Sequence, residues 1–175
     1  MEASMIKRKI AVLGLGPAGG IFAAHLAAAG HMVYGVDIWA EHLHEIRKNG
    51  LRITNLTSLQ GRLQEVSSHL GQLGEKKFDY VVIAVKTPNM PAVVSYLKDF
   101  PGDFQVVVLQ NGLDNEEYLI DFFPRERILR MAVNYAGNIV SPGVIKMNFF
   151  AGPNQVGCIC AQRGCLHGEE IARLM

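Results

Sequence analysis

A glycine-rich turn near the N-terminus constrains the fold of this 175-residue chain more than any other feature. It follows an apolar run at residues 9–13 that predicts a short buried strand, and it precedes an alanine-rich segment that predicts a helix over 17–29. The turn itself reads Gly14-Leu15-Gly16-Pro17-Ala18-Gly19. A G-x-G-x-x-G between a strand and a helix indicates a phosphate-binding turn, because free N–H groups and the positive end of the helix face the anion. The alternative is a turn whose glycines only let a helix pack closely on its strand.

The rest of the chain alternates between strand-like and helix-like segments. The strand-like runs are 32–37, 79–85 and 105–109, the helix-like segments are 40–49, 91–100 and 115–123, and two short extended pieces are 51–54 and 61–66. This alternation predicts an α/β fold of the Rossmann type, a doubly wound and mainly parallel sheet with helices on both faces. Further strand-like runs follow at 128–133, 144–149 and 156–161. We interpret these runs as a partly antiparallel C-terminal extension at the edge of the same sheet.

Composition excludes several classes of protein. Apolar residues make up 49% of the chain and charged residues 19%, which favours a packed core over disorder. The net charge of +1 gives no basic surface for nucleic acid or for an anionic membrane. Three cysteines are too few for a disulfide scaffold, so a reduced, cytoplasmic setting is expected. Basic residues at 7–9 before an apolar stretch at 10–29 are also typical of a secretory signal peptide. Because glycines and a proline interrupt that stretch, we favour a strand, a turn and a helix over a signal peptide.

An aspartate supplies the context that the glycine-rich turn needs. Asp37 ends the second predicted strand, 18 residues after Gly19, which completes a dinucleotide-binding fingerprint. Within it, Gly14 permits the tight turn, Gly16 lets the backbone approach the pyrophosphate, and Gly19 lets the helix pack on the strand. A carboxylate at Asp37 accepts hydrogen bonds from a ribose 2′-hydroxyl and repels a 2′-phosphate, and no arginine follows it directly. The residues therefore favour NAD, with a solvated loop aspartate as the alternative.

Two further candidate sites follow predicted strands, at the sheet edge where open α/β folds bind ligands. Lys86 comes directly after the run 81–85, where its ammonium group suits a carboxylate or a ribose hydroxyl. Gln110-Asn111-Gly112 follows the next strand, and Asn111 offers a donor and an acceptor together. The alternatives are an exposed loop lysine and an ordinary Asn-Gly turn.

Other residues that commonly bind ligands are discounted. Cys158, Cys160, Cys165 and His167 have the residue types of a zinc site, but the first two lie at strand spacing on one face, which favours packing over tetrahedral ligation. His42 and His44 diverge on a predicted helix, so we expect a solvated face. Tyr135 and Trp39 are interpreted as packing or rim aromatics. No metal site is expected.

With these residues in place, the chain resembles the coenzyme-binding N-terminal half of the ketopantoate reductase (2-dehydropantoate 2-reductase) family over about residues 9–157. The resemblance rests on the fingerprint and on the segments 42–51, Val85-Lys86, 110–112, 134–137 and 142–143. It implies NADPH-dependent reduction of a 2-keto acid, ketopantoate, to its 2-hydroxy acid in pantothenate synthesis. It further implies that the 14–19 loop and Val85 bind the coenzyme, that Lys86 and Asn111 contact both coenzyme and substrate, and that Ala136 lies on the nicotinamide side.

The chain departs from the family's pattern in two respects. The family's principal catalytic lysine and a substrate-binding glutamate belong to a helical C-terminal domain, so we expect residues 1–166 to form the NAD(P)-binding domain and 167–175 to begin the helix that leads to the other. The chain alone is then expected to bind coenzyme with little turnover, with no catalytic residue of its own. The family usually favours NADP(H), whereas Asp37 favours NAD(H). Two other interpretations remain: a stand-alone NAD(H)-binding sensor without catalysis, and another two-domain dehydrogenase. A homodimer is plausible in each case.

Overall fold

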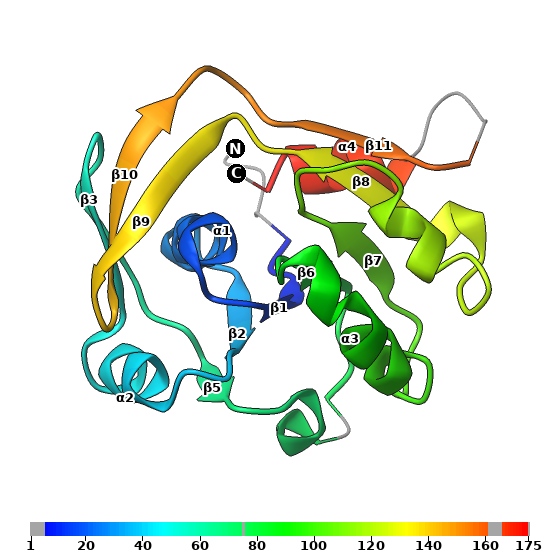
Figure 1. Ribbon diagram of the computed structural model, residues 1–175, viewed down its shortest axis with the longest axis horizontal. Coiled ribbons are helices and arrows are strands. Elements are labelled where there is room, and N and C mark those ends of the chain that lie inside the picture. Colours follow the sequence, from blue (N-terminus) through cyan, green and yellow to red (C-terminus); the bar gives the residue numbers. More distant parts are fainter. Residues whose placement is uncertain (1–5, 75, 161–165, 175) are drawn as a thin grey trace.

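A seven-stranded sheet forms the centre of the computed structural model, which describes residues 6–74, 76–160 and 166–174 (Figure 1). Its strand order is β11-β8-β7-β6-β1-β2-β5. The strands are β1 (Lys9–Leu13), β2 (Met32–Val36), β5 (Glu65–Ser67), β6 (Tyr80–Ile83), β7 (Gln105–Val108), β8 (Ile128–Ala132) and β11 (Gln155–Cys158). All neighbours are parallel except β11, which runs antiparallel to β8 at the edge. The predicted Rossmann-type sheet is confirmed.

The central strands are buried on both faces, as their continuous apolar runs predict. In β1, Ile10 and Val12 pack on the side of α1 (Pro17–Ala28) and α4 (Leu166–Ala172). The alternate residues Ala11 and Leu13 pack on the side of α3 (Met90–Leu97) and the single turn η1 (Leu70–Leu73). Because side chains of a strand point to opposite faces in turn, these two apolar layers require helices on both faces of the sheet.

A second sheet, which the sequence does not predict, covers the outer side of α1. It has the order β4-β3-β10-β9, made from β3 (Leu51–Asn55), β4 (Leu59–Gly61), β9 (Tyr135–Ser141) and β10 (Val144–Phe150). The prediction that 144–149 extends the main sheet is therefore wrong. The reason lies in α1, which is apolar on all sides and must bury both of its faces. Gly20 and Gly61 allow this close packing, since a Cβ on Gly61 would lie 2.6 Å from the Cα of Ala24.

The remaining helices match the predictions unevenly. The helix α2 (Ala40–Asn49) has the predicted bounds, and α3 is shorter than the predicted 91–100 helix. The predicted helix over 115–123 is wrong, because only the single turn η3 (Asn115–Tyr118) forms there. Asp114 precedes it with a left-handed φ of 60°, and Asn115 is buried by contacts to neighbouring loops. Two further single turns are η2 (Thr87–Asn89) and η4 (Arg125–Arg127).

The C-terminal helix packs back onto the main sheet. α4 begins at Leu166 and buries Ile171 in the core. Glu170 forms an ion pair with Arg8 and accepts a hydrogen bond of 2.8 Å from the Tyr80 hydroxyl. Burial raises the pKa of Tyr80 above its usual value, and the hydrogen bond to Glu170 raises it further. The helix predicted from His167 is thus present, and its continuation into another domain stays a prediction.

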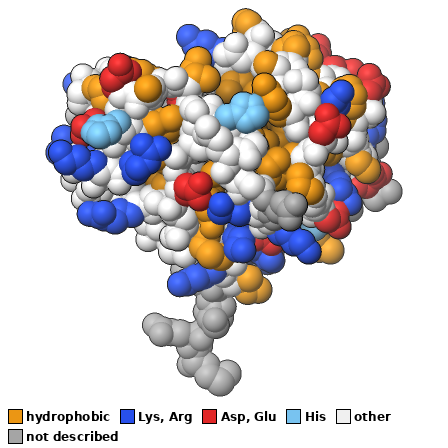
Figure 2. All heavy atoms as spheres, turned by 90° about the horizontal axis from the view of Figure 1, so that it is seen from below, with side chains coloured by type: hydrophobic (Ala, Val, Ile, Leu, Met, Phe, Trp, Pro, Cys, Tyr) orange, Lys and Arg blue, Asp and Glu red, His pale blue; other side chains and the backbone are white. Residues whose placement is uncertain are grey.

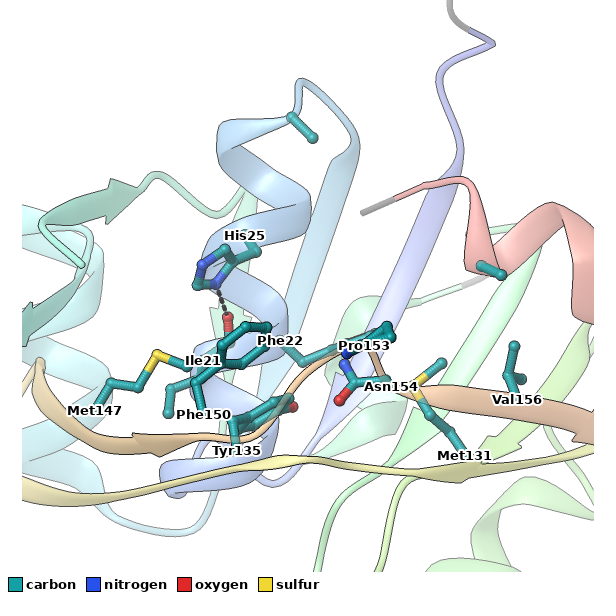
Figure 3. Close-up of a pocket in the computed structure, with 12 residues that line it drawn as sticks. Ile21, Phe22, His25, Met131, Tyr135, Met147, Phe150, Pro153, Asn154 and Val156 are labelled. Carbon is teal, nitrogen blue, oxygen red and sulfur yellow. Dashed lines mark hydrogen bonds between the residues drawn. The ribbon is translucent and has the colours of Figure 1, made fainter. Parts of the chain in front are cut away.

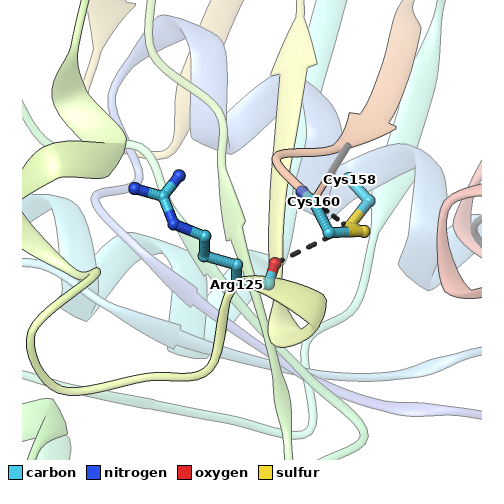
Figure 4. The surroundings of a disulfide bond; sticks show 3 residues. All are labelled: Arg125, Cys158 and Cys160. Atoms are coloured by element: carbon cyan, nitrogen blue, oxygen red, sulfur yellow. Dashed lines mark hydrogen bonds between the residues drawn. A yellow bond between two sulfur atoms is a disulfide. The ribbon is translucent and has the colours of Figure 1, made fainter. Parts of the chain in front are cut away.

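Two cysteines at the end of β11 are joined in a disulfide (Figure 4). Cys158 and Cys160 were expected to pack side by side on one strand face, and this is wrong because β11 ends at Cys158. The chain turns there, the Cα atoms of the two cysteines lie 5.2 Å apart, and the N–H of Cys160 donates to the Cys158 sulfur at 3.1 Å. Cys165, the third candidate zinc ligand, lies outside the described residues.

The surface in Figure 2 carries basic and acidic side chains interspersed with apolar ones. This face therefore has no extended region of a single charge, in keeping with a net charge of +1. Within the described ranges, no helix is both long and apolar enough to cross a membrane.

Candidate functional site

The glycine-rich loop has the geometry that its three glycines predict. Gly14 has a φ of +94°, and a Cβ there would lie 3.0 Å from the backbone at Ala84 and Val85, where the chain leaves β6. A Cβ on Gly19 would lie 2.7 Å from the Cβ of Ala84 and closer still to the carbonyl oxygen of Gly14. A Cβ on Gly16 would meet no atom within 4 Å. Two glycines thus serve close packing, and Gly16 faces open space where a ligand can approach.

The start of α1 leaves backbone donors free for an anion. The helix begins at Pro17 with Gly16 as its N-cap, and no side chain caps it in the described part of the chain. The first N–H groups of a helix have no partner within the helix, and this end of α1, where Pro17 itself has no N–H, adjoins the open space at Gly16. This arrangement suits a pyrophosphate without any basic side chain.

Asp37 is fixed against the glycine-rich loop. Its Oδ2 accepts a hydrogen bond of 2.7 Å from the N–H of Leu15, and its Oδ1 accepts one of 3.0 Å from the N–H of Trp39. A carboxylate has about four acceptor positions, so two remain for further donors. Asp37 therefore holds the loop in place and can still accept hydrogen bonds from ribose hydroxyls.

His42 supports the same loop, and the expectation of a solvated histidine at this position is wrong. The side chain is 1% exposed, and its Nε2 donates to the carbonyl of Leu15 at 3.0 Å. Its Nδ1 accepts from the N–H of Gly143 at 2.9 Å, which ties the loop to the turn between β9 and β10. The half-exposed Trp39 stacks on the imidazole ring, which agrees with its interpretation as a rim aromatic. No signal in the sequence near His42 marks this role, since both partners are distant in the chain.

Lys86 and Asn111 lie together at a cavity of about 370 Å³ beside the glycine-rich loop. It opens where β6 and β7 end, and its lining residues are Ala18, Ala84, Val85, Lys86, Thr87, Pro88, Leu109, Gln110, Asn111 and Val133. Four candidate residues from the sequence, Ala18, Val85, Lys86 and Asn111, thus share one cavity. Asp37 lies outside it, beyond β1 on the side of β2. The candidate site thus extends along the carboxyl ends of β2, β1, β6 and β7, with the loop at its middle, and we call this region the crevice.

A network of polar side chains joins the two strand-end loops. The hydroxyl of Thr87 donates to Asn115 Oδ1 at 2.9 Å, and Asn115 Nδ2 donates to the carbonyl of Asn111 at 3.4 Å. Arg130 pairs with Glu116 and also donates to the carbonyl of Gly112. These contacts fix the spacing between Lys86 and Asn111.

Ala136 occupies a different place from the other candidates. It lies exposed in β9 and is not among the residues that line the cavity at Lys86. Its neighbour Tyr135 is connected to the loop, because its hydroxyl donates to the carbonyl of Ala18 at 2.9 Å. Burial raises the pKa of Tyr135 above its usual value, so this hydroxyl stays protonated as a donor. A coenzyme contact by Ala136 stays a prediction.

A second cavity of about 420 Å³ lies further along α1, toward the C-terminal end of the helix (Figure 3). Its walls are mainly apolar, with Phe22 from α1, Met131 from β8 and Phe150 from β10 among them. The ring of His25 is turned to its own helix, since Nδ1 donates to the carbonyl of Ile21 at 2.8 Å. Its described lining includes no Lys, Arg, Asp or Glu, and its polar side chains are His25, Tyr135 and Asn154.

The fold and the loop together define a domain of the Rossmann type that carries a dinucleotide-binding fingerprint. The strand order reverses between β1 and β6, and the loop lies at that reversal, where such sheets bind NAD(P). The comparison with known families is specific, because the ketopantoate reductase family (PanE/ApbA) matches residues 10–160. The chain belongs to this family.

Curated relatives that this chain matches are longer than it is. A 2-dehydropantoate 2-reductase from Nostoc is 30% identical over 142 residues, which is 81% of this chain and 44% of that protein. One from Mesorhizobium japonicum is 32% identical over 106 residues, 60% of this chain and 32% of that protein. The chain thus spans less than half the length of these curated relatives.

Solved structures agree on the fold. The 2-dehydropantoate 2-reductase of Geobacter metallireducens superposes with a TM-score of 0.81 at 25% identity, over 95% of this chain and 54% of that one. A D-mandelate dehydrogenase in a ternary structure with NADH and anilino(oxo)acetate gives a TM-score of 0.80 at 24% identity, over 95% of this chain and 53% of that one.

Proposed function

We propose that this chain is the coenzyme-binding part of an NADH-dependent reductase of a 2-keto acid. The observation that carries the proposal is the carboxylate of Asp37, held at 2.7 Å from the N–H of Leu15 at the edge of the glycine-rich loop. This position is the one at which a Rossmann acidic residue accepts hydrogen bonds from the ribose of NAD. Its two remaining acceptor positions match two ribose hydroxyls.

The surroundings of Asp37 favour NADH over NADPH. A 2′-phosphate would bring about two negative charges next to this carboxylate at neutral pH. The residues that follow are Ile38 and Trp39, both exposed, so neither supplies a cation to bind the phosphate. The family's usual preference for NADP(H) therefore does not extend to this chain.

The substrate is proposed to lie at the other end of the crevice. The ammonium group of Lys86 suits the carboxylate of a 2-keto acid, and the amide of Asn111 suits its ketone or a ribose hydroxyl. When bound, the coenzyme supplies the hydride that turns the ketone into an alcohol. By the names of its relatives, the keto acid is 2-dehydropantoate. The whole protein is proposed to carry out this reduction, and this chain alone to bind coenzyme with little turnover.

The test is a titration of the chain with NADH and with NADPH, followed by nicotinamide fluorescence. The wild type is expected to bind NADH about tenfold more tightly, a difference of about 1.4 kcal/mol. Asp37→Asn, which removes the charge and keeps the shape, is expected to bring the two affinities close together.

Glu41→Gln is the matched control for this titration. Glu41 lies exposed in the first turn of α2, four residues after Asp37, so its variant loses the same charge without touching the loop. It should keep the preference of the wild type. If the wild type binds NADPH as tightly as it binds NADH, the assignment of Asp37 is contradicted. Measurable reduction of 2-dehydropantoate by this chain alone would contradict the expected lack of turnover.

A further inference from the structure

The disulfide between Cys158 and Cys160 joins no two distant elements of the fold (Figure 4). One residue separates the two cysteines, so the bond closes a loop of only three residues. A disulfide that stabilises a fold usually closes a long loop, because the constraint on the unfolded chain grows with loop length. The attachment of β11 rests instead on backbone hydrogen bonds, since residues 155–158 pair with β8 and the N–H of Ile159 donates to the carbonyl of Ile128 at 3.1 Å. Opening the disulfide should therefore leave the sheet intact.

The Cys158 sulfur has backbone neighbours that suit both of its reduced forms. The N–H of Cys160 donates to it at 3.1 Å, and a backbone donor in this position stabilises a thiolate. The carbonyl of Arg125 lies 3.6 Å from the same sulfur, where it can accept a hydrogen bond from a protonated thiol. Both groups belong to the backbone, so neither depends on the rotamer of a side chain. Cys158 is thus the better leaving sulfur when the bond opens.

The pair lies at the surface and away from the crevice. Both cysteines are partly exposed, and the contact between the Cys158 sulfur and the carbonyl of Arg125 is exposed. Because β11 is antiparallel to β8, Cys158 lies opposite Leu129, near the amino end of β8, whereas the crevice lies at the carboxyl ends of the parallel strands. Within the described ranges, the two cysteines do not belong to a group of three or more potential metal ligands.

We infer that Cys158 and Cys160 are a redox-active pair that exchanges reversibly with a small thiol of the glutathione class. The thiolate of one small thiol attacks the Cys160 sulfur, the S–S bond breaks, and Cys158 leaves as the thiolate that the Cys160 N–H stabilises. A second small thiolate attacks the mixed disulfide at the sulfur of the first, which releases Cys160 and one oxidised small thiol. The chain thereby gains two electrons and two protons. An oxidised small thiol closes the bond again by the reverse steps.

The test starts from the oxidised chain with Cys165→Ser, which leaves only this pair to react. In about 10 mM reduced glutathione at neutral pH and without denaturant, the pair is expected to open within about an hour, whereas a structural disulfide resists the glutathione pool. Thiols are counted by mass spectrometry after acid quenching and alkylation. An excess of oxidised glutathione should then remove both thiols again. If Cys165→Ser fails to fold, peptide mapping of the wild type follows the same two cysteines.

The position of the mixed disulfide tests which sulfur leaves. Peptide mapping of samples quenched during reduction should find glutathione mainly on Cys160. In the same background, Cys158→Ser is the matched control, because its Cys160 should form an adduct with oxidised glutathione that persists without a second thiol to displace it. An equal or larger amount of glutathione on Cys158 would overturn the assignment of Cys158 as the leaving sulfur. A persistent adduct in the chain that keeps both cysteines would overturn the exchange itself.

Circular dichroism and the NADH titration separate exchange from unfolding. The oxidised and reduced forms should have the same spectrum and should bind NADH with affinities within about twofold, because the pair lies at the edge of the sheet opposite the crevice. The inference would be overturned by a bond that glutathione does not open, by thiols that oxidised glutathione does not close, or by loss of the folded spectrum on reduction. Thiol counts do not depend on coenzyme binding, so failure of the proposed function would leave this inference intact, and the reverse also holds.

Discussion

Adding one methyl group at Gly19 should cost stability, although alanine is the better helix former. The new Cβ would lie 2.7 Å from the Cβ of Ala84, where carbon atoms ordinarily approach to about 3.5 Å or more, so the helix must move by about 1 Å. The backbone oxygen of Gly14 is closer still and cannot rotate away. Overpacking of this kind costs about 1–3 kcal/mol or more, against a helix-propensity gain of about 1 kcal/mol. We expect Gly19→Ala to lower the free energy of unfolding by about 2 kcal/mol.

Alanine at Gly16 should weaken coenzyme binding and leave the stability of the fold intact. Gly16 has a φ of −63°, which alanine adopts without strain, and its Cβ would meet no protein atom. Stability should stay equal or rise by up to about 1 kcal/mol, because the unfolded chain loses freedom. Affinity for coenzyme should fall by about tenfold or more, because the methyl group occupies the space in front of the helix where the pyrophosphate belongs.

Urea unfolding and coenzyme titration of the two variants, side by side, measure both effects. The reasoning requires that Gly19→Ala loses stability and that Gly16→Ala loses binding without losing stability. It would be refuted by a Gly19→Ala variant as stable as the wild type, or by a Gly16→Ala variant that binds NADH as well as the wild type does.

Two further predictions concern groups that support the site and the C-terminal helix. His42→Ala should lower the free energy of unfolding, measured in urea, by about 3 kcal/mol, because two buried backbone groups lose their hydrogen-bond partner. His44→Ala on the exposed face of the same helix should change it by less than about 0.5 kcal/mol. Equal losses in the two variants would contradict the role of His42. The raised pKa of Tyr80 predicts that the free energy of unfolding falls as pH rises above about 10, because this tyrosine ionises in the unfolded chain before it does so in the folded one. Between about pH 9 and 11, the free energy of unfolding should fall less in Tyr80→Phe than in the wild type. Parallel plots of the free energy of unfolding against pH would show that Tyr80 does not contribute.

The parts of the site that depend on neighbouring residues in the chain could be predicted from the sequence. The loop at 14–19 and the helix after it need only local backbone geometry and the burial of one strand, and both are recorded in the spacing of glycines and apolar residues. Lys86 and Asn111 could also be placed together, because the carboxyl ends of parallel strands meet at one edge of a sheet.

The second sheet could not be predicted in this way. In it, β10 pairs in parallel with β3, so that Val144 lies opposite Arg52, and nothing in either segment specifies the other. Both strands are half-exposed, which is typical of an edge strand in any sheet. The requirement comes from α1, whose outer apolar face needs a cover, and this becomes evident only once the main sheet is built.

His42 illustrates the same limit for a single side chain. A histidine on the polar side of a helix pattern is usually solvated, and its neighbours here, Glu41 and His44, are indeed exposed. Its partners are the carbonyl of Leu15 and the N–H of Gly143, 27 and 101 residues away. Hydrogen bonds over such separations depend on the assembled fold and leave no periodic pattern in the sequence.

The burial of α1 between two sheets has a consequence for the affinity of the site. A helix that is covered on one side can tilt or fray when its end is not capped, but this one cannot move without opening one sheet or the other. The donors at its start are therefore already ordered before any ligand arrives. Binding does not spend free energy on immobilising them, so the phosphate contacts contribute to affinity almost in full. The second sheet, which bonds to the loop through the Tyr135 hydroxyl and through His42, thus acts as a scaffold that preorganises the anion-binding end of the helix.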